Sequence, residues 1–96
     1  MHLVQLLLPI VGEREVFDEV MHELTERYGG VTAYTRAPAA GRWKNRSAST
    51  EHDDIVVIEV MVEELDKRWW ARYRNKLEKR LRQKELVVRA HRIESL

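Results

Sequence analysis

The amino-acid sequence predicts an α+β domain, in which a four-stranded antiparallel sheet carries two helices on one face. Four short segments rich in apolar and β-branched residues predict strands, and two longer segments repeat apolar residues at helical spacing. Their order along the chain is β-α-β-β-α-β, which is the ferredoxin-like pattern. Right-handed crossovers then place both helices on the same face, with the first and third strands at the centre.

The four strand segments differ in how apolar they are. HLVQLLL is short and is closed by Pro9, so its length favours a buried strand over a helix. DDIVVIEVMV is apolar on both faces except at Glu59, as expected for a central strand. The predicted strands are 2–8, 31–35, 53–62 and 85–93.

Two amphipathic segments predict the helices. The first helix is expected in EREVFDEVMHELTERYGG, which ends at Gly29 and Gly30, and glycine suits a left-handed C-cap. The second helix is expected in EELDKRWWARYRNKLEKRLRQK, with Asp66 as its N-cap. Each segment gathers apolar residues on one face, which we expect to pack on the sheet. These residues are Val16, Phe17, Val20, Met21, Leu24 and Tyr28 in the first helix, and Leu65, Trp69, Trp70, Tyr73, Leu77 and Leu81 in the second.

Composition and charge limit the classes of function. The length predicts one domain, residues 1–96, in which 17 Lys and Arg nearly balance 16 Asp and Glu. A nearly neutral chain argues against a general nucleic-acid or anionic-membrane binder. The absence of cysteine excludes disulfides and thiolate metal sites. No apolar run reaches the about 18 residues of a membrane span, and the N-terminus lacks a signal-peptide pattern, so we expect a cytoplasmic location.

The second helix is strongly basic, since Glu78 is the only acidic residue between Lys67 and Lys84. Basic residues interleaved with aromatics are typical of nucleic-acid binding. However, the aromatics fall on the apolar stripe, and the first helix is acidic, so we expect the two helices to pair by charge. The first and third strands also lack the aromatics on which RNA-binding domains of this topology stack bases. Nucleic-acid binding therefore ranks last among the functions considered.

The sheet face turned away from the helices is predicted to be apolar. Strand alternation places Gln5 and Glu59 on it. Around them it places Leu3, Leu7, Ile55, Val57 and Met61. Because monomers rarely expose so large an apolar patch, we expect a second subunit, the long loop or a ligand to cover this face. A homodimer through this face is the preferred expectation.

Glu59 is the main candidate for chemistry, because a carboxylate in a covered central strand is costly unless it is paired. One interpretation is a small pocket in which Glu59 acts as a general base, with His91 as a second catalytic candidate. A ligand site would then comprise Gln5, Glu59, Arg89 and His91, with Trp43 from the loop. The other interpretation is structural, with Glu59 bonded to an arginine or a tyrosine hydroxyl inside a dimer interface. The sequence does not fix whether Arg89 and His91, or Arg92, face outward.

No metal or cofactor is expected. The EHDD segment, residues 51–54, resembles a metal cluster only weakly, because adjacent strand residues alternate between faces. The chain also has no glycine-rich phosphate-binding motif.

The connection between the second and third strands is longer than a hairpin requires. We expect a long flexible loop over residues 37–52. Trp43 stands in it among small and basic residues, and we interpret it as an anchor that holds the loop on an apolar surface. That surface is the uncovered sheet face or a neighbouring subunit.

Three stretches resemble a family of small bacterial proteins grouped as a domain of unknown function: GGVTAY…GRW, DDIVVIEVMV and RQKELVVRA. The most specific element is GGVT, residues 29–32, followed at loop distance by Gly41-x-Trp43. The resemblance extends over residues 16–93. It departs from the family pattern at Lys84, which separates Gln83 from Glu85. The resemblance implies the ferredoxin-like fold and carries no established activity.

The sequence thus predicts a homo-oligomeric domain that is non-catalytic or binds a small ligand. The alternative is a small-molecule enzyme of the dimeric α+β-barrel kind, with a pocket centred on Glu59 and Trp43 as its gate.

Overall fold

The structure, a computed structural model, describes residues 1–10, 13–44 and 50–96, without the side chains of 36–39, 43–44 and 50–53. The elements are β1 (His2–Leu8), α1 (Arg14–Tyr28), β2 (Thr32–Lys44), β3 (Thr50–Val62), α2 (Lys67–Arg80) and β4 (Val87–Arg92). They confirm the predicted α+β class. No helix within these ranges is long and apolar enough to cross a membrane.

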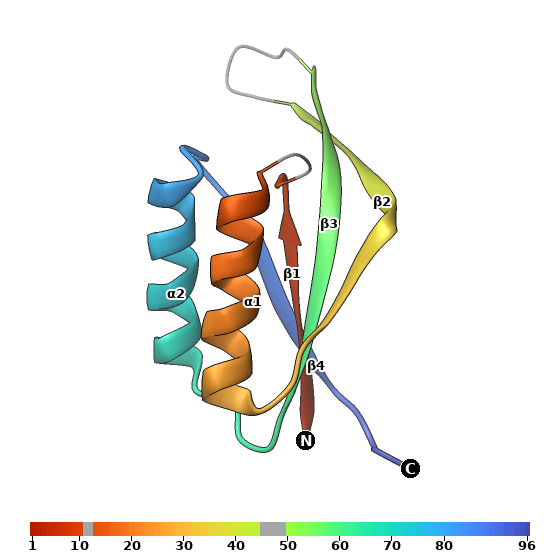
Figure 1. Ribbon diagram of the computed structural model, residues 1–96, viewed down its shortest axis with the longest axis vertical. Coiled ribbons are helices and arrows are strands. Elements are labelled where there is room, and N and C mark those ends of the chain that lie inside the picture. The colour runs from red at the N-terminus through yellow and green to blue at the C-terminus, as the bar shows by residue number, and fades with distance from the viewer. Residues whose placement is uncertain (11–12, 45–49) are drawn as a thin grey trace.

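The strands form one sheet, and in the described residues its order is β2-β3-β1-β4. Every neighbouring pair is antiparallel. Gln5 is central in this sheet, because it lies between Glu59 on β3 and Arg89 on β4. Both helices cover the same face, and the other face carries no helix (Figure 1). This arrangement leaves one side of the central strands available for a function.

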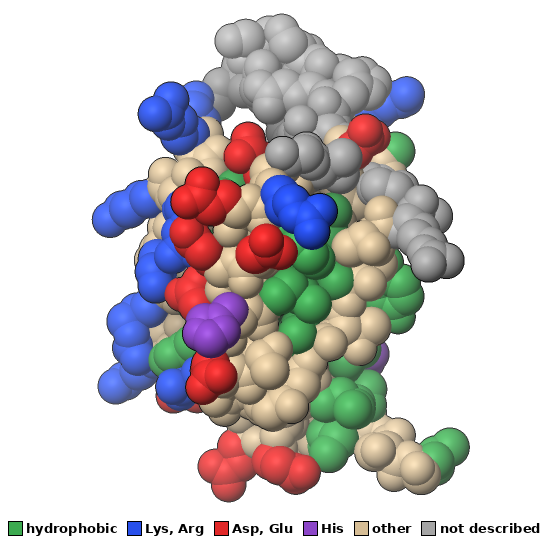
Figure 2. Space-filling model, viewed as in Figure 1, with side chains coloured by type: hydrophobic (Ala, Val, Ile, Leu, Met, Phe, Trp, Pro, Cys, Tyr) green, Lys and Arg blue, Asp and Glu red, His purple; other side chains and the backbone are tan. Residues whose placement is uncertain are grey.

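The two helices pair by charge, as the sequence predicts. Arg80 lies 3.0 Å from a carboxylate oxygen of Glu19 and 3.0 Å from one of Glu23, and Lys76 lies 3.0 Å from the other oxygen of Glu23. Figure 2 shows the basic side chains gathered over α2 and the acidic ones over α1. Burial disfavours the Glu23 carboxylate, but hydrogen bonds and charges from Arg80 and Lys76 outweigh burial and lower its pKa. Lys76 and Arg80 of the basic helix therefore serve to hold the two helices together.

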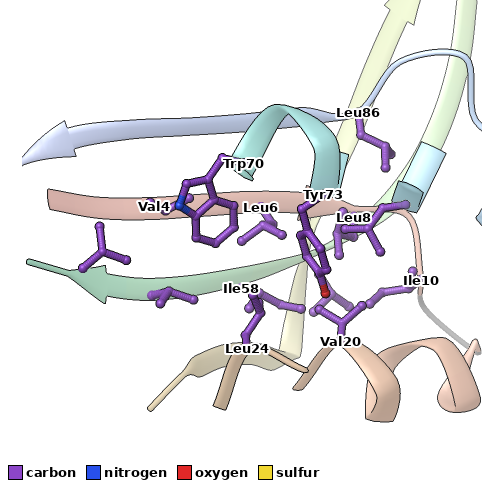
Figure 3. Packing of buried hydrophobic residues seen from close by; sticks show 14 residues of the cluster. Val4, Leu6, Leu8, Ile10, Val20, Leu24, Ile58, Trp70, Tyr73 and Leu86 are labelled. Carbon is purple, nitrogen blue, oxygen red and sulfur yellow. The ribbon is translucent and has the colours of Figure 1, made fainter. Parts of the chain in front are cut away.

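The core lies between the helices and the sheet (Figure 3). Alternate residues of the two central strands point into it, as predicted: Val4, Leu6, Leu8, Val56, Ile58, Val60 and Val62 are all at most 5% exposed. From α2, Trp70 and Tyr73 are buried, and Trp69 packs between them and Tyr28 in stacked and edge-on ring contacts. The aromatics of the basic helix are therefore core residues and do not form a stacking surface.

The two helix caps predicted from the sequence, the C-cap at Gly29 and the N-cap at Asp66, are confirmed. Gly29 adopts a φ of 84°, and its N–H donates to the carbonyl of Thr25 at 2.8 Å. Asp66 accepts a hydrogen bond from the backbone N–H of Trp69 at 3.0 Å. α2 is shorter than the predicted 63–84, because it starts only after this cap and ends before Arg82, whose φ of 54° interrupts the helix.

The predicted loop over residues 37–52 is wrong for residues 37–44 and 50–52, which are strand. β2 and β3 pair from Ala39 with Ile55 to Lys44 with Thr50, after a register shift between Tyr34 and Ala39. β1 ends its pairing at Val56, so these pairs form a two-stranded arm beyond the end of β1 (Figure 1). Small residues such as Ala39, Ala40 and Gly41 have a low strand propensity. They form a strand here because their backbone pairs with β3.

Trp43 belongs to this arm, since its backbone pairs with Glu51 in β3. Its side chain lies outside the described part of the structure. The anchor role of Trp43, and its role as a gate, therefore stay predictions.

Candidate functional site

The candidate site is the sheet face that carries no helix, which we call the open face. The strand register fixes its members, because directly paired residues of antiparallel strands point to the same side. They are Thr32 and Tyr34 of β2, Val57, Glu59 and Met61 of β3, Leu3, Gln5 and Leu7 of β1, and Val87, Arg89 and His91 of β4. The register also resolves the orientation of β4: Arg89 and His91 face outward.

Four polar side chains cross the open face in one hydrogen-bonded line, with one residue from each strand. The Nε of Arg89 donates to Oε1 of Gln5 at 3.0 Å, and Nε2 of Gln5 donates to Oε2 of Glu59 at 2.7 Å. The hydroxyl of Tyr34 donates to Oε1 of Glu59 at 2.9 Å. We call Arg89, Gln5, Glu59 and Tyr34 the polar row. Both carboxylate oxygens of Glu59 thus accept a hydrogen bond from a different neighbour.

Apolar residues lie on both sides of the polar row. Leu7 pairs with Val57 and Val87 on one side, and Leu3 pairs with Met61 on the other. Met61 is 55% exposed and Val87 is 49% exposed. Ile55, which the sequence also assigned to this face, is only 7% exposed and lies next to the register shift in β2. The open face therefore has a polar centre between two apolar borders.

The structure brings together three of the predicted site residues, Gln5, Glu59 and Arg89. His91 is on the same face but is paired with Leu3, one step along the strand from the polar row. Among the described residues it has no hydrogen bond to Glu59. The geometry thus separates the two candidate catalytic residues, and it supplies no acid–base pair between them.

Tyr34 is a site residue that the sequence pattern did not single out. The signal lies in strand alternation: in VTAYT, Thr32 and Tyr34 share one face, and Ala33 points to the other. Pairing of Thr32 with Glu59 and of Tyr34 with Val57 then brings the tyrosine hydroxyl to the carboxylate. Only the register of β2 against β3, which the sequence does not contain, shows this contact.

The Tyr34–Glu59 hydrogen bond should be visible in the titration of the phenol. The bond and the charge of Glu59 raise the pKa of Tyr34 above its usual value near 10. Neutral Tyr34 is the donor, so its stabilising effect is present below about pH 10 and is lost as the pH rises through the folded-state pKa. We expect Glu59→Gln to lower the Tyr34 pKa toward that of an ordinary tyrosine. Site-resolved NMR titration checks this, with Tyr28 as an internal control.

In the described residues, no three His, Asp or Glu side chains are placed to hold a metal ion. Most of the EHDD segment has its side chains outside the described part. The open face therefore offers hydrogen-bond donors, one carboxylate and apolar area as its means of binding.

Comparisons with known proteins add no relative. A scan against protein-family models, a search of curated proteins and a search of solved structures each gave no match for this chain. The resemblance to the domain family with the GGVT…GxW pattern stays a prediction.

Proposed function

We propose that the chain is a self-associating domain of ferredoxin-like topology, and that its open face binds the open face of a second copy. The β-α-β-β-α-β order and the strand order β2-β3-β1-β4 support the topology. The observation that carries the function is the composition of the open face, in which a polar row joined by three hydrogen bonds lies between exposed apolar residues.

Covering the open face is favourable for its apolar residues, and the hydrogen bonds of the polar row reduce the cost of covering the polar residues. Each Å² of apolar surface removed from water contributes about 25 cal/mol, and Met61 and Val87 expose about half of their surface. Polar groups oppose burial only when they lose hydrogen bonds that are not replaced. The hydrogen bonds within the polar row use both oxygens of Glu59 and one donor each of Arg89, Gln5 and Tyr34, so the row is covered at a smaller cost than four isolated side chains.

The order of residues in the polar row favours a second copy over an unrelated partner. A two-fold axis parallel to the strands superposes the row on itself in reverse. Arg89 then lies over Tyr34 of the partner subunit, and Gln5 lies over Glu59 of the partner subunit. A guanidinium over an aromatic ring is attractive, and an amide donor over a carboxylate can hydrogen-bond. The open face is in this sense complementary to itself, as an isologous dimer interface requires.

The same contacts favour a binding or structural role for Glu59 over the enzyme alternative. Each oxygen of Glu59 already accepts a hydrogen bond from a neighbouring strand, which holds the carboxylate within the polar row, and no acid–base partner among the described residues is bonded to it. The second catalytic candidate, His91, is not bonded to the polar row. A non-catalytic dimer with Glu59 inside its interface accounts for these contacts.

Sedimentation equilibrium of the purified protein tests the proposal, with an expected mass of twice the 11.4 kDa chain. The position of the interface is tested by NMR of the methionine methyl groups with a soluble paramagnetic probe. We expect Met61 to be protected at concentrations that favour the dimer, whereas the accessibility of Met21, on α1 at the other side of the sheet, should not change on dilution. A monomer at high protein concentration, or a dimer in which Met61 stays accessible, would contradict the proposal.

A further inference from the structure

A groove of about 310 Å³ lies between α2 and the edge strand β4, on the helix side of the sheet. Its lining includes Val4 of β1, Trp70 of α2, and Val88 and Ala90 of β4, so its floor is apolar. Val4 and Trp70 are among the core side chains drawn in Figure 3. The strand side chains of the floor point to the helix side of the sheet, opposite to the open face, and Arg89, whose side chain belongs to the polar row, also borders the groove.

The groove exists because α2 leaves one end of β4 uncovered. Ala90 pairs with Val4, so its side chain points toward the helix layer, yet Ala90 is exposed while Val4 is 1% exposed. Ala71 faces the same space from α2. Small side chains on both walls leave a volume at the lower end of the range in which small-molecule sites are found.

The polar groups of the groove are donors and cations. Lys67 and Arg74 lie two turns apart on α2, and both line the groove. Of the residues that the structure describes, no acidic side chain lines it. The indole Nε1–H of Trp70 is buried and has no hydrogen-bond partner among the described residues, although the residue is only 5% exposed. A buried donor without a partner is unfavourable, which favours a ligand that brings an acceptor.

We propose that this groove binds a small amphipathic carboxylate. The apolar part lies on the floor formed by Val4, Val88 and Ala90, and the carboxylate accepts hydrogen bonds from Arg74 and Lys67. An alcohol of equal length fills the floor and leaves the cations unpaired, and an amine of equal length is repelled by them. The proposal is independent of the dimer, because no residue that is assigned here to the ligand belongs to the open face.

The test is an NMR titration of the ¹⁵N-labelled protein with octanoate, with octanol and octylamine as probes of the head group. We expect a saturable shift of the Trp70 indole N–H and of the backbone N–H groups of Val88 and Ala90. Arg74→Ala should weaken octanoate binding by about tenfold or more, because a hydrogen bond to a charged group is lost. Arg72→Ala removes the same charge from the same helix outside the groove and should change affinity little.

A second variant tests the floor. Ala90→Phe fills the groove from an exposed position, so the protein should keep its fold and lose the octanoate shifts. The proposal is overturned if octanoate gives no saturable shift, if octanol binds as tightly as octanoate, or if Arg72→Ala weakens binding as much as Arg74→Ala does.

Discussion

Replacing Met61 with lysine should convert the proposed dimer to a monomer. Met61 borders the polar row on the open face and is 55% exposed in the single chain, so lysine is accommodated in the monomer without strain. In the dimer the ammonium group would be desolvated against apolar side chains without a partner. We expect the dimer dissociation constant to rise by about 30-fold or more, which corresponds to about 2 kcal/mol. Sedimentation equilibrium over a range of concentrations measures it.

Leu96→Lys is the matched control for Met61→Lys. Leu96 is a fully exposed apolar residue outside the sheet, so the same change of charge there should leave the dissociation constant within about twofold. If Met61→Lys and Leu96→Lys dimerise equally well, the open face is not the interface.

Glu59→Ala should lower the free energy of unfolding more than any other change in the polar row. It removes the acceptor for both Gln5 and Tyr34, and each donor left unpaired under the partner costs about 1–3 kcal/mol. Glu59→Gln keeps one acceptor oxygen, so it should lower the free energy of unfolding less than Glu59→Ala does. Urea unfolding at one fixed protein concentration measures these differences.

A double-mutant cycle with Tyr34→Phe assigns part of this loss to one contact. Phenylalanine removes the hydroxyl donor, so Glu59→Ala should cost less in the Tyr34→Phe background than in the wild type. Unchanged stability of Glu59→Ala would contradict a structural role. It would then favour the enzyme alternative, in which this carboxylate is retained for chemistry.

The parts of the fold that could be predicted from the sequence depend on local periodicity. Alternation in DDIVVIEVMV and HLVQLLL correctly separated the buried residues of the central strands from Gln5 and Glu59. The caps at Gly29 and Asp66 were predictable because each uses a residue whose conformation or side chain suits a helix end. Burial of one face of a strand produces an alternating apolar pattern within that strand, which can be recognised without knowing the partner strand.

The parts that were missed depend on pairing between strands. The arm of β2 and β3 has small and polar residues, so its strands form through their ladder and not through propensity. The contact between Tyr34 and Glu59 depends on the register of those same strands. The groove beside Ala90 depends on where α2 stops covering β4, which no short stretch of sequence encodes.

The position of β4 at the border of the sheet also limits how large an assembly can grow. An edge strand has unpaired backbone N–H and C=O groups, which can hydrogen-bond to a strand of another chain. Such pairing can repeat from chain to chain and lead to open-ended association. Arg89 and Arg92 project from opposite sides of β4, so two such strands brought together would place like charges close to each other on both sides. This repulsion disfavours edge-to-edge pairing through β4, and so favours the proposed face-to-face dimer over continued addition of copies at this edge.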